Sequence, residues 1–153
     1  MQGPTAHRIA VRCVTAADQA PQAVPAVLVM DSDAFSRHQL VASLARLSDN
    51  VRGCADVLEV LTRLRVDPPV VVVLVARPVE QPTRLAEIRL LTQRIPGCPI
   101  VVLVDRASED LTRDGLSAGA SAVVSFSAGI PAFIAIVSAH LQGAGSESQD
   151  RIA

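Results

Sequence analysis

Between residues 26 and 142, short apolar runs alternate with segments in which apolar residues recur every three or four positions. The runs are five or six residues long, the usual length of a β-strand. The segments between them have the spacing of amphipathic α-helices. The predicted strands cover four such runs, at residues 26–30, 70–75, 99–104 and 122–126, and a short, more mixed segment at 51–55. The pattern therefore predicts strands and helices in strict alternation, with a helix after each strand.

Polar residues and prolines mark where the predicted helices begin and end. Residues 31–33 (Asp-Ser-Asp), Asp56 and Ser108 each stand just before a helical segment, where their side chains can cap its first turn. Pro68 and Pro69 end one helix before the third strand. Pro131 stands in the first turn of the last helix, which is predicted to end near residue 141.

The alternation of strands and helices predicts an α/β fold with a parallel sheet. Residues 70–75 form an apolar run without interruption, which is typical of a strand covered on both faces. Right-handed crossovers and this length favour a doubly wound, flavodoxin-like sheet of five strands, in the order 2-1-3-4-5, with helices on both faces. The predicted domain covers residues 26–142.

The two ends of the chain differ from this domain. Residues 1–25 read as a lead or linker with a short strand possible at 8–14. Residues 143–153 begin Gly-Ala-Gly-Ser and are predicted to form a flexible tail or linker.

Composition excludes several kinds of chemistry. The 153 residues carry a net charge of −1, and all 14 basic residues are Arg. Without Lys, no Schiff base or P-loop lysine can form. The chain has no Trp or Tyr, and no basic recognition helix, so we expect no nucleic-acid binding. Cys13, Cys54 and Cys98 lack the spacing of a zinc site, and no cofactor motif is present, so we expect neither metal nor cofactor. Arg84, Arg89 and Arg94 are expected on a solvated helix face.

Charged residues gather where the predicted strands end. Asp33, Arg77, Asp105 and Arg106 all follow a strand, and ligands of such sheets bind beyond the carboxyl ends of the strands. One interpretation is a ligand or partner pocket with charges of both signs. The other is a set of helix caps and ion pairs, for example between Asp31 and Arg77.

Residues 26–141 resemble the receiver domain of bacterial response regulators. The resemblance rests on VLVMDSDAFSR (27–37), PPVVVVLVARP (68–78) and CPIVVLVDRAS with LSAGASAVVSF (98–108 and 116–126). It implies the CheY-like fold. A working receiver carries a phosphorylated Asp at the end of its third strand, four residues before a proline. Here that proline is Pro78, so the resemblance places Leu74 at the phosphoacceptor position.

Most other positions of the receiver site are also replaced. Asp31 matches the first acid of the Mg²⁺-binding pair, but Ser32 stands at the second. Val104 replaces the switch Ser or Thr, and Phe126 replaces the Lys. Val123 replaces the switch aromatic residue. The resemblance therefore implies a degenerate receiver, which is not an enzyme and which neither binds a metal nor accepts a phosphoryl group.

The last predicted helix is apolar around its circumference. Its large side chains are Phe133, Ile134, Ile136, Val137 and Leu141. Because a helix at the end of the fold cannot be covered on all sides by its own domain, we expect these residues, with Val123 on the preceding strand, to form an interface. Receiver families commonly dimerise through this face. Alternatively, the N-terminal lead covers the helix, and Ile134→Asp or Val137→Asp then destabilises the monomer.

These observations predict a cytoplasmic, non-enzymatic signalling module that acts as a homodimer or on a partner regulatory protein. The tail resembles the linker to the DNA-binding part of two-domain transcriptional regulators of the LuxR/NarL type, which implies transcription regulation. The glycine, serine and proline residues that interrupt the charge-free stretch 115–146 argue against a membrane span. Two alternatives stay open: a small-ligand-binding domain, and a receiver activated by a ligand or through Asp33 or Asp105.

Overall fold

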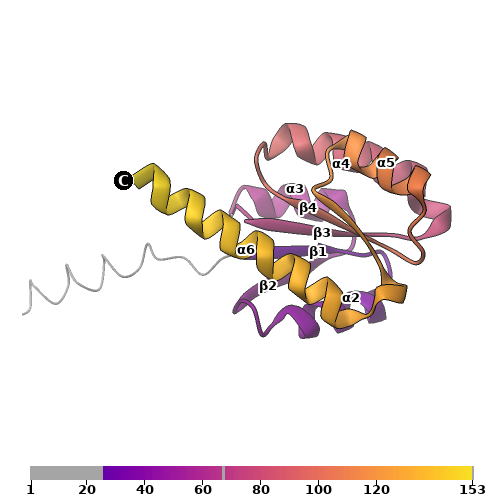
Figure 1. The fold of residues 1–153 in the computed structure, drawn as a ribbon, viewed down its shortest axis with the longest axis horizontal. Coiled ribbons are helices and arrows are strands. Elements are labelled where there is room, and N and C mark those ends of the chain that lie inside the picture. The colour runs from indigo at the N-terminus through magenta and orange to yellow at the C-terminus, as the bar shows by residue number, and fades with distance from the viewer. Residues whose placement is uncertain (1–25, 67, 153) are drawn as a thin grey trace, which may run out of the picture.

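The structure, a computed structural model, describes residues 26–66 and 68–152, with side chains described as far as Gly143. The described residues form a five-stranded parallel sheet in the order β2-β1-β3-β4-β5, with helices on both faces (Figure 1). The predicted fold class and strand order are thus confirmed. The strands are β1 (Ala26–Met30), β2 (Asn50–Cys54), β3 (Val71–Ala76), β4 (Ile100–Val104) and β5 (Ala122–Ser125). The helices are α2 (Ala34–Leu44), α3 (Val57–Leu64), α4 (Gln81–Arg94), α5 (Glu109–Ala118) and α6 (Ile130–Ile152), with short 3₁₀ turns η1 (Pro78–Glu80) and η2 (Phe126–Ala128).

The sheet separates two apolar cores. Successive side chains of a strand point to opposite faces, so that Val73 and Val75 pack on one side of β3 while Leu74 packs on the other. The first core is closed by α3, α4 and α5, and the second by α2 and α6. This burial on both faces explains why the central strands read as uninterrupted apolar runs.

Side-chain caps start three of the helices where the sequence predicted them. Asp33 accepts the backbone N–H of Ser36 at 2.7 Å and begins α2. Asp56 begins α3 in the same way, and Ser108 accepts the N–H of Leu111 at 3.1 Å to begin α5. Each cap satisfies a backbone donor that has no partner inside its helix.

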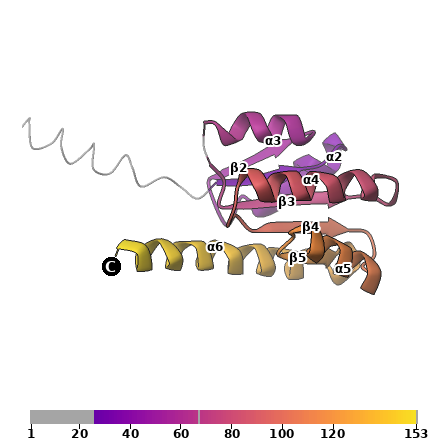
Figure 2. The ribbon, with the colours of Figure 1, turned by 90° about the horizontal axis from the view of Figure 1, so that it is seen from above.

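Four of the five strands differ from their predicted bounds by one residue at one or both ends, and the last helix differs more. The third strand runs from Val71 to Ala76, one residue later than expected. Helix α6 continues to Ile152, although residues 143–153 were predicted to be a flexible tail. Glycines at 143 and 145 weaken a helix, but no proline after Pro131 stops it. Its last turns project beyond the ends of the strands (Figures 1 and 2). The predicted lead, with its possible strand at 8–14, lies outside the described residues.

Helix α6 packs its large side chains on the domain's own sheet. Phe133 and Val137 are 1% and 0% exposed and belong to the second core, so the prediction that they form an exposed interface is wrong. Ile134, Ile136 and Leu141 are half-buried against the same core. The sequence pattern does not show this arrangement, because the outer face of α6 is formed by small apolar residues such as Ala135 and Ala139 and not by charged ones. Val123 is half-buried and packs against the first core.

Candidate functional site

The candidate site lies at the carboxyl edge of the sheet, around Asp31. Asp31 follows β1 directly and is fully buried. Its backbone N–H donates to the carbonyl of Cys54 at 3.0 Å, and its own carbonyl accepts from Arg37 Nη1 at 2.7 Å. The N–H of Asp33 donates to Asp31 Oδ1 at 3.0 Å. The backbone of Asp31 is therefore held by β2 and α2, and its carboxylate is held by the turn that leads into α2.

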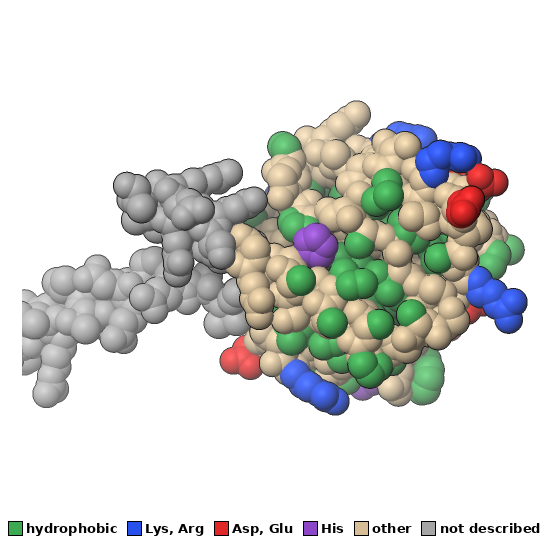
Figure 3. All heavy atoms as spheres, viewed as in Figure 1, with side chains coloured by type: hydrophobic (Ala, Val, Ile, Leu, Met, Phe, Trp, Pro, Cys, Tyr) green, Lys and Arg blue, Asp and Glu red, His purple; other side chains and the backbone are tan. Residues whose placement is uncertain are grey.

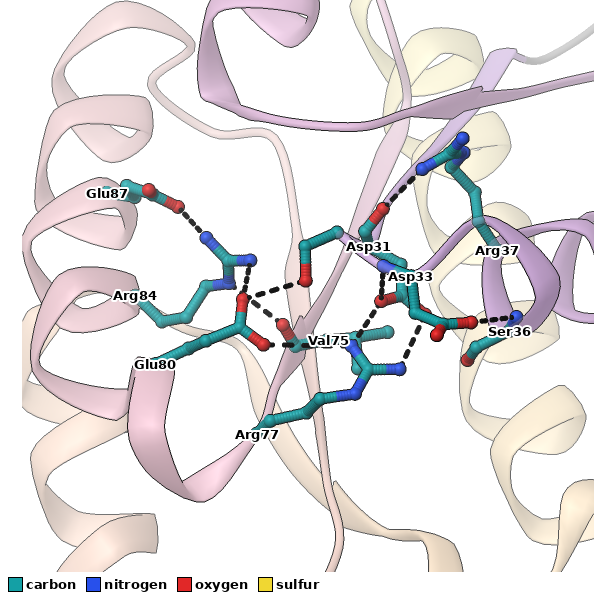
Figure 4. A network of polar contacts seen from close by, with 10 residues as sticks. Asp31, Asp33, Ser36, Arg37, Val75, Arg77, Glu80, Arg84 and Glu87 are labelled. Carbon is teal, nitrogen blue, oxygen red and sulfur yellow. Dashed lines mark hydrogen bonds and ion pairs between the residues drawn. The ribbon is translucent and has the colours of Figure 1, made fainter.

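The carboxylate of Asp31 forms an ion pair with Arg77, which follows β3 (Figure 4). Arg77 Nη1 donates to Oδ1, and Nη2 lies 3.4 Å from Oδ2. The ion pair that the sequence suggested for these two residues is thus present. It brings one positive charge to a carboxylate that has no access to water, which is the main requirement for burying such a group.

The surroundings of Asp31 change its proton affinity in two opposite ways. Burial is the largest effect and by itself raises the pKa of the carboxyl group. Hydrogen bonds from Arg77, Ser36 and the backbone of Asp33, together with the positive charge of Arg77, outweigh burial and hold the pKa of Asp31 below its ordinary value. The same contact with Asp31 raises the pKa of Arg77. The pair is therefore fully ionised at neutral pH.

The polar contacts continue from Arg77 into α4. Glu80 lies 3.7 Å from Arg77, accepts the hydroxyl of Ser32 at 3.0 Å and forms an ion pair with Arg84. Arg84 also donates to the carbonyl of Val75 at 2.9 Å and to Glu87 at 2.8 Å. Figure 4 shows this chain of contacts running from β1 through the end of β3 to α4.

Arg84 does not lie on a solvated helix face as its sequence pattern predicts. It is 5% exposed rather than on a solvated face, and each end of its guanidinium has an acceptor. Its spacing from Glu80 and Glu87, four and three residues, was the available signal, because such pairs meet on one face of a helix. The register of β3 against α4, which brings the carbonyl of Val75 within reach, is not visible in the sequence.

The position that the resemblance matches to the phosphoacceptor lies on β3. Leu74 is not at the end of the third strand but inside it, fully buried and level with Met30 and Val102. Ala76 is the last residue of β3 and is paired with Val104. Whichever of the two is matched, the position on β3 offers no oxygen that could accept a phosphoryl group.

The remaining predicted site residues surround this edge. Ser32 and Asp33 are exposed, the first bonded to Glu80 and the second capping α2. Asp105 and Arg106 are exposed on the loop after β4. Val104 is fully buried and makes no polar contact through its side chain.

A hollow of about 670 Å³ opens at the same edge. Its walls are mainly apolar, with three polar residues among them. The lining residues are Ser36, Val75, Ala76, Arg77, Pro78, Val79, Asp105 and Phe126. Its volume is in the range of small-molecule sites. Among the described residues, no group of three or more His, Cys, Asp or Glu side chains is placed to hold a metal ion.

Comparison of the coordinates with solved structures identifies the architecture. A response regulator from Thermotoga maritima matches with a TM-score of 0.65 and 19% identity, over 78% of this chain and 99% of that one. A response regulator receiver protein from Pseudoalteromonas atlantica matches with a TM-score of 0.68 and 16% identity, over 78% and 99%. The chain has the receiver fold. A Burkholderia thailandensis protein, provisionally named as a pilus assembly protein, shares this fold with a TM-score of 0.67 and 16% identity, over 77% and 98%.

At these identities the receiver fold is what the comparisons show. No protein-family model matches the sequence, and no curated protein matches it. The receiver fold places the Asp31–Arg77 pair at the edge where the resemblance put the phosphorylation chemistry. Within the described residues, no helix is both long enough and apolar enough to cross a membrane.

Proposed function

We propose that this chain is a non-enzymatic signalling module with a degenerate receiver site, which acts through protein–protein contacts and not through phosphorylation. The observation that carries the proposal is the ion pair between Asp31 and Arg77. A receiver uses its acidic pocket to hold Mg²⁺, which requires carboxylates free to coordinate it. Here the guanidinium of Arg77 forms an ion pair with the buried carboxylate of Asp31, so that this carboxylate is not free to bind a metal ion. In addition, β3 ends in Ala76, which has no nucleophilic oxygen.

Phosphorylation can be tested directly by mass. We expect the full chain, incubated with acetyl phosphate and Mg²⁺, to show no adduct of about 80 Da in its intact mass. We also expect about 10 mM Mg²⁺ to leave the melting temperature unchanged, since a ligand that binds only the folded state raises it. An adduct that disappears in Asp33→Asn or Asp105→Asn would overturn the proposal and show activation by a non-standard route.

The contact surface we propose is the outer face of α6. No residue from Gly115 to Ser146 carries a formal charge. Figure 3 shows hydrophobic side chains gathered over the middle of this face, with acidic and basic side chains at its margin. Pro131, Ala135 and Ala139 are exposed there, and Ile134 and Ile136 are half-buried beside them. Small and apolar side chains without charges are suited to close contact with a second copy or a partner regulatory protein.

Light scattering on a dilution series tests this surface. We expect a dimer that Ala139→Arg dissociates, because the new charge has no partner in an apolar contact. Ala86→Arg is the matched control, since Ala86 is an exposed alanine on α4. Val137→Asp should instead unfold the domain, because Val137 is fully buried. A monomer at every concentration would refute self-association, and a dimer unaffected by Ala139→Arg would place the contact elsewhere.

We place this module in the cytoplasm and in transcription regulation, with no nucleic-acid or membrane contact by the stretch 1–153. The resemblance of the sequence to response regulators supports this placement. The receiver fold alone does not select the pathway, because it occurs both in response regulators and in the pilus-assembly relative. A gel shift at physiological salt should show no specific DNA binding by these residues. A sub-micromolar, salt-resistant complex would contradict this.

A second candidate function is small-ligand binding at the carboxyl edge. The hollow beside Arg77 favours it, because it combines apolar walls with a few polar groups. The two candidates are compatible, since a ligand at this edge and a contact through α6 use different surfaces.

A further inference from the structure

The hollow at the carboxyl edge has an apolar floor and an accessible mouth. Val75 and Ala76 are 1% and 3% exposed and close its inner side. Val79, on η1, is 91% exposed, and Phe126 is half-buried, so that both offer apolar surface to an incoming group. Covering such side chains removes apolar area from water, which favours a ligand with a hydrophobic body.

The charged side chains that line the hollow are Arg77 and Asp105, and of the two only Arg77 has an ion-pair partner among the described residues. The guanidinium of Arg77 is bound to Asp31, so that these two charges offset each other. Asp105 accepts the hydroxyl of Ser125 at 3.1 Å through its backbone carbonyl. Its carboxylate makes no hydrogen bond or ion pair with the described part of the chain. One exposed carboxylate is thus left at the wall of an apolar hollow.

We propose that this hollow binds a small amphipathic amine: an aromatic or branched apolar body against Val79 and Phe126, with its ammonium group on the carboxylate of Asp105. A cation is favoured over an anion because Asp105 is the lining residue whose charge has no partner among the described residues. The ring of Phe126 adds to this preference, since the face of an aromatic ring attracts cations. The inference deepens the second candidate function and rests on it, but it does not require the proposed contact through α6.

The absence of Trp and Tyr from the chain makes an indole probe suitable. Tryptamine, tryptophol and indole-3-propionate have the same ring with a cationic, neutral and anionic group. We would titrate the full chain into each and follow indole fluorescence anisotropy, and then locate the bound probe by chemical shift changes of backbone amides. We expect tryptamine to bind with a Kd of about 1 mM, which is usual for a molecule of its size. Tryptophol should bind about five-fold more weakly, since an exposed ion pair contributes modestly, and the propionate more weakly still.

Two variants separate the charge from the apolar wall. Asp105→Asn should weaken tryptamine binding to the level of tryptophol and leave tryptophol unchanged. Val79→Ala should weaken both probes, and the exposure of Val79 makes this change safe for folding. Asp49→Asn, at an exposed carboxylate before β2, is the matched control and should change neither.

Three results would overturn the inference. The first is that tryptamine does not bind at about 10 mM. The second is that tryptamine and tryptophol bind equally well. The third is that the Asp105→Asn variant binds tryptamine as tightly as the unmodified chain does. Each result concerns the hollow alone. Phosphorylation and oligomeric state are measured separately, so such a failure would leave the signalling proposal standing.

Discussion

Removing the arginine from the buried ion pair is the most direct test of how this edge is held together. In Arg77→Leu, Asp31 keeps its hydrogen bond from the N–H of Asp33 but loses Arg77, the one cation among the described residues that contacts its carboxylate. Because Asp31 is fully buried, water cannot replace the missing partner without a rearrangement. We expect the domain to fold but to be clearly less stable at neutral pH.

The size of the loss follows from the burial of the two partners. Removing one member of a fully buried pair typically costs about 3–5 kcal/mol. The Arg77 side chain is 34% exposed, so that solvent screens its half of the interaction. We therefore expect a loss of about 2–3 kcal/mol, which corresponds to a fall in melting temperature of about 5–10 °C for a domain of this size.

The loss of stability caused by Arg77→Leu should depend on pH and become smaller in acid. The pKa of Asp31 is below its ordinary value of 3.8 in the folded protein, so the pair contributes stability above that value. This contribution is lost as the pH falls through the lowered pKa. Without Arg77, burial is opposed only by the remaining hydrogen bonds, and the pKa of Asp31 rises. The variant can then take up a proton at a higher pH than the unmodified chain does, and the stability difference should narrow from about pH 7 to about pH 4.

Urea unfolding followed by the helical circular dichroism signal measures this difference, since the chain has no Trp or Tyr. Arg113→Leu is the matched control, because Arg113 is 67% exposed and pairs with Asp110 on the surface of α5 at 3.0 Å. It should cost less than about 0.5 kcal/mol. The reasoning fails if Arg77→Leu is within about 0.5 kcal/mol of the unmodified chain, or if its penalty is the same at both pH values.

Two further predictions concern a turn and the thiols. Gly119 ends α5 with φ +123°, and a Cβ there would lie 2.2 Å from Thr92 Oγ1. Gly119→Ala should therefore lower the free energy of unfolding in urea by about 2 kcal/mol. An unchanged unfolding midpoint would refute this. Burial raises the pKa of Cys98 to about 11 and also that of Cys54. In Cys13→Ser, both thiols should therefore resist a thiol-specific reagent at about pH 8 until urea is added, and rapid labelling of the folded chain would contradict this.

The candidate site could be predicted in part. The residues Asp31, Asp33, Arg77 and Asp105 were found because each follows an apolar strand, and parallel strands end at one edge of the sheet. The spacing of Arg84 from Glu80 and Glu87 indicates its ion pairs, but its burial could not be predicted, since burial depends on how α4 lies against the end of β3. The level of Leu74 within the sheet could not be predicted for a similar reason. Counting back from Pro78 fixes a position along the chain but not the register that pairs Ala76 with Val104.

The sequence by itself determined the fold. Strand-length apolar runs, helical periodicity and side-chain caps are local signals, and right-handed crossovers leave few ways to connect them. Only the tertiary structure decided what each surface can do. It buried Phe133 and Val137 against the sheet, joined Asp31 to Arg77, and left Asp105 at the wall of an apolar hollow. These outcomes depend on distances between segments remote in the sequence, which no local pattern of residues specifies.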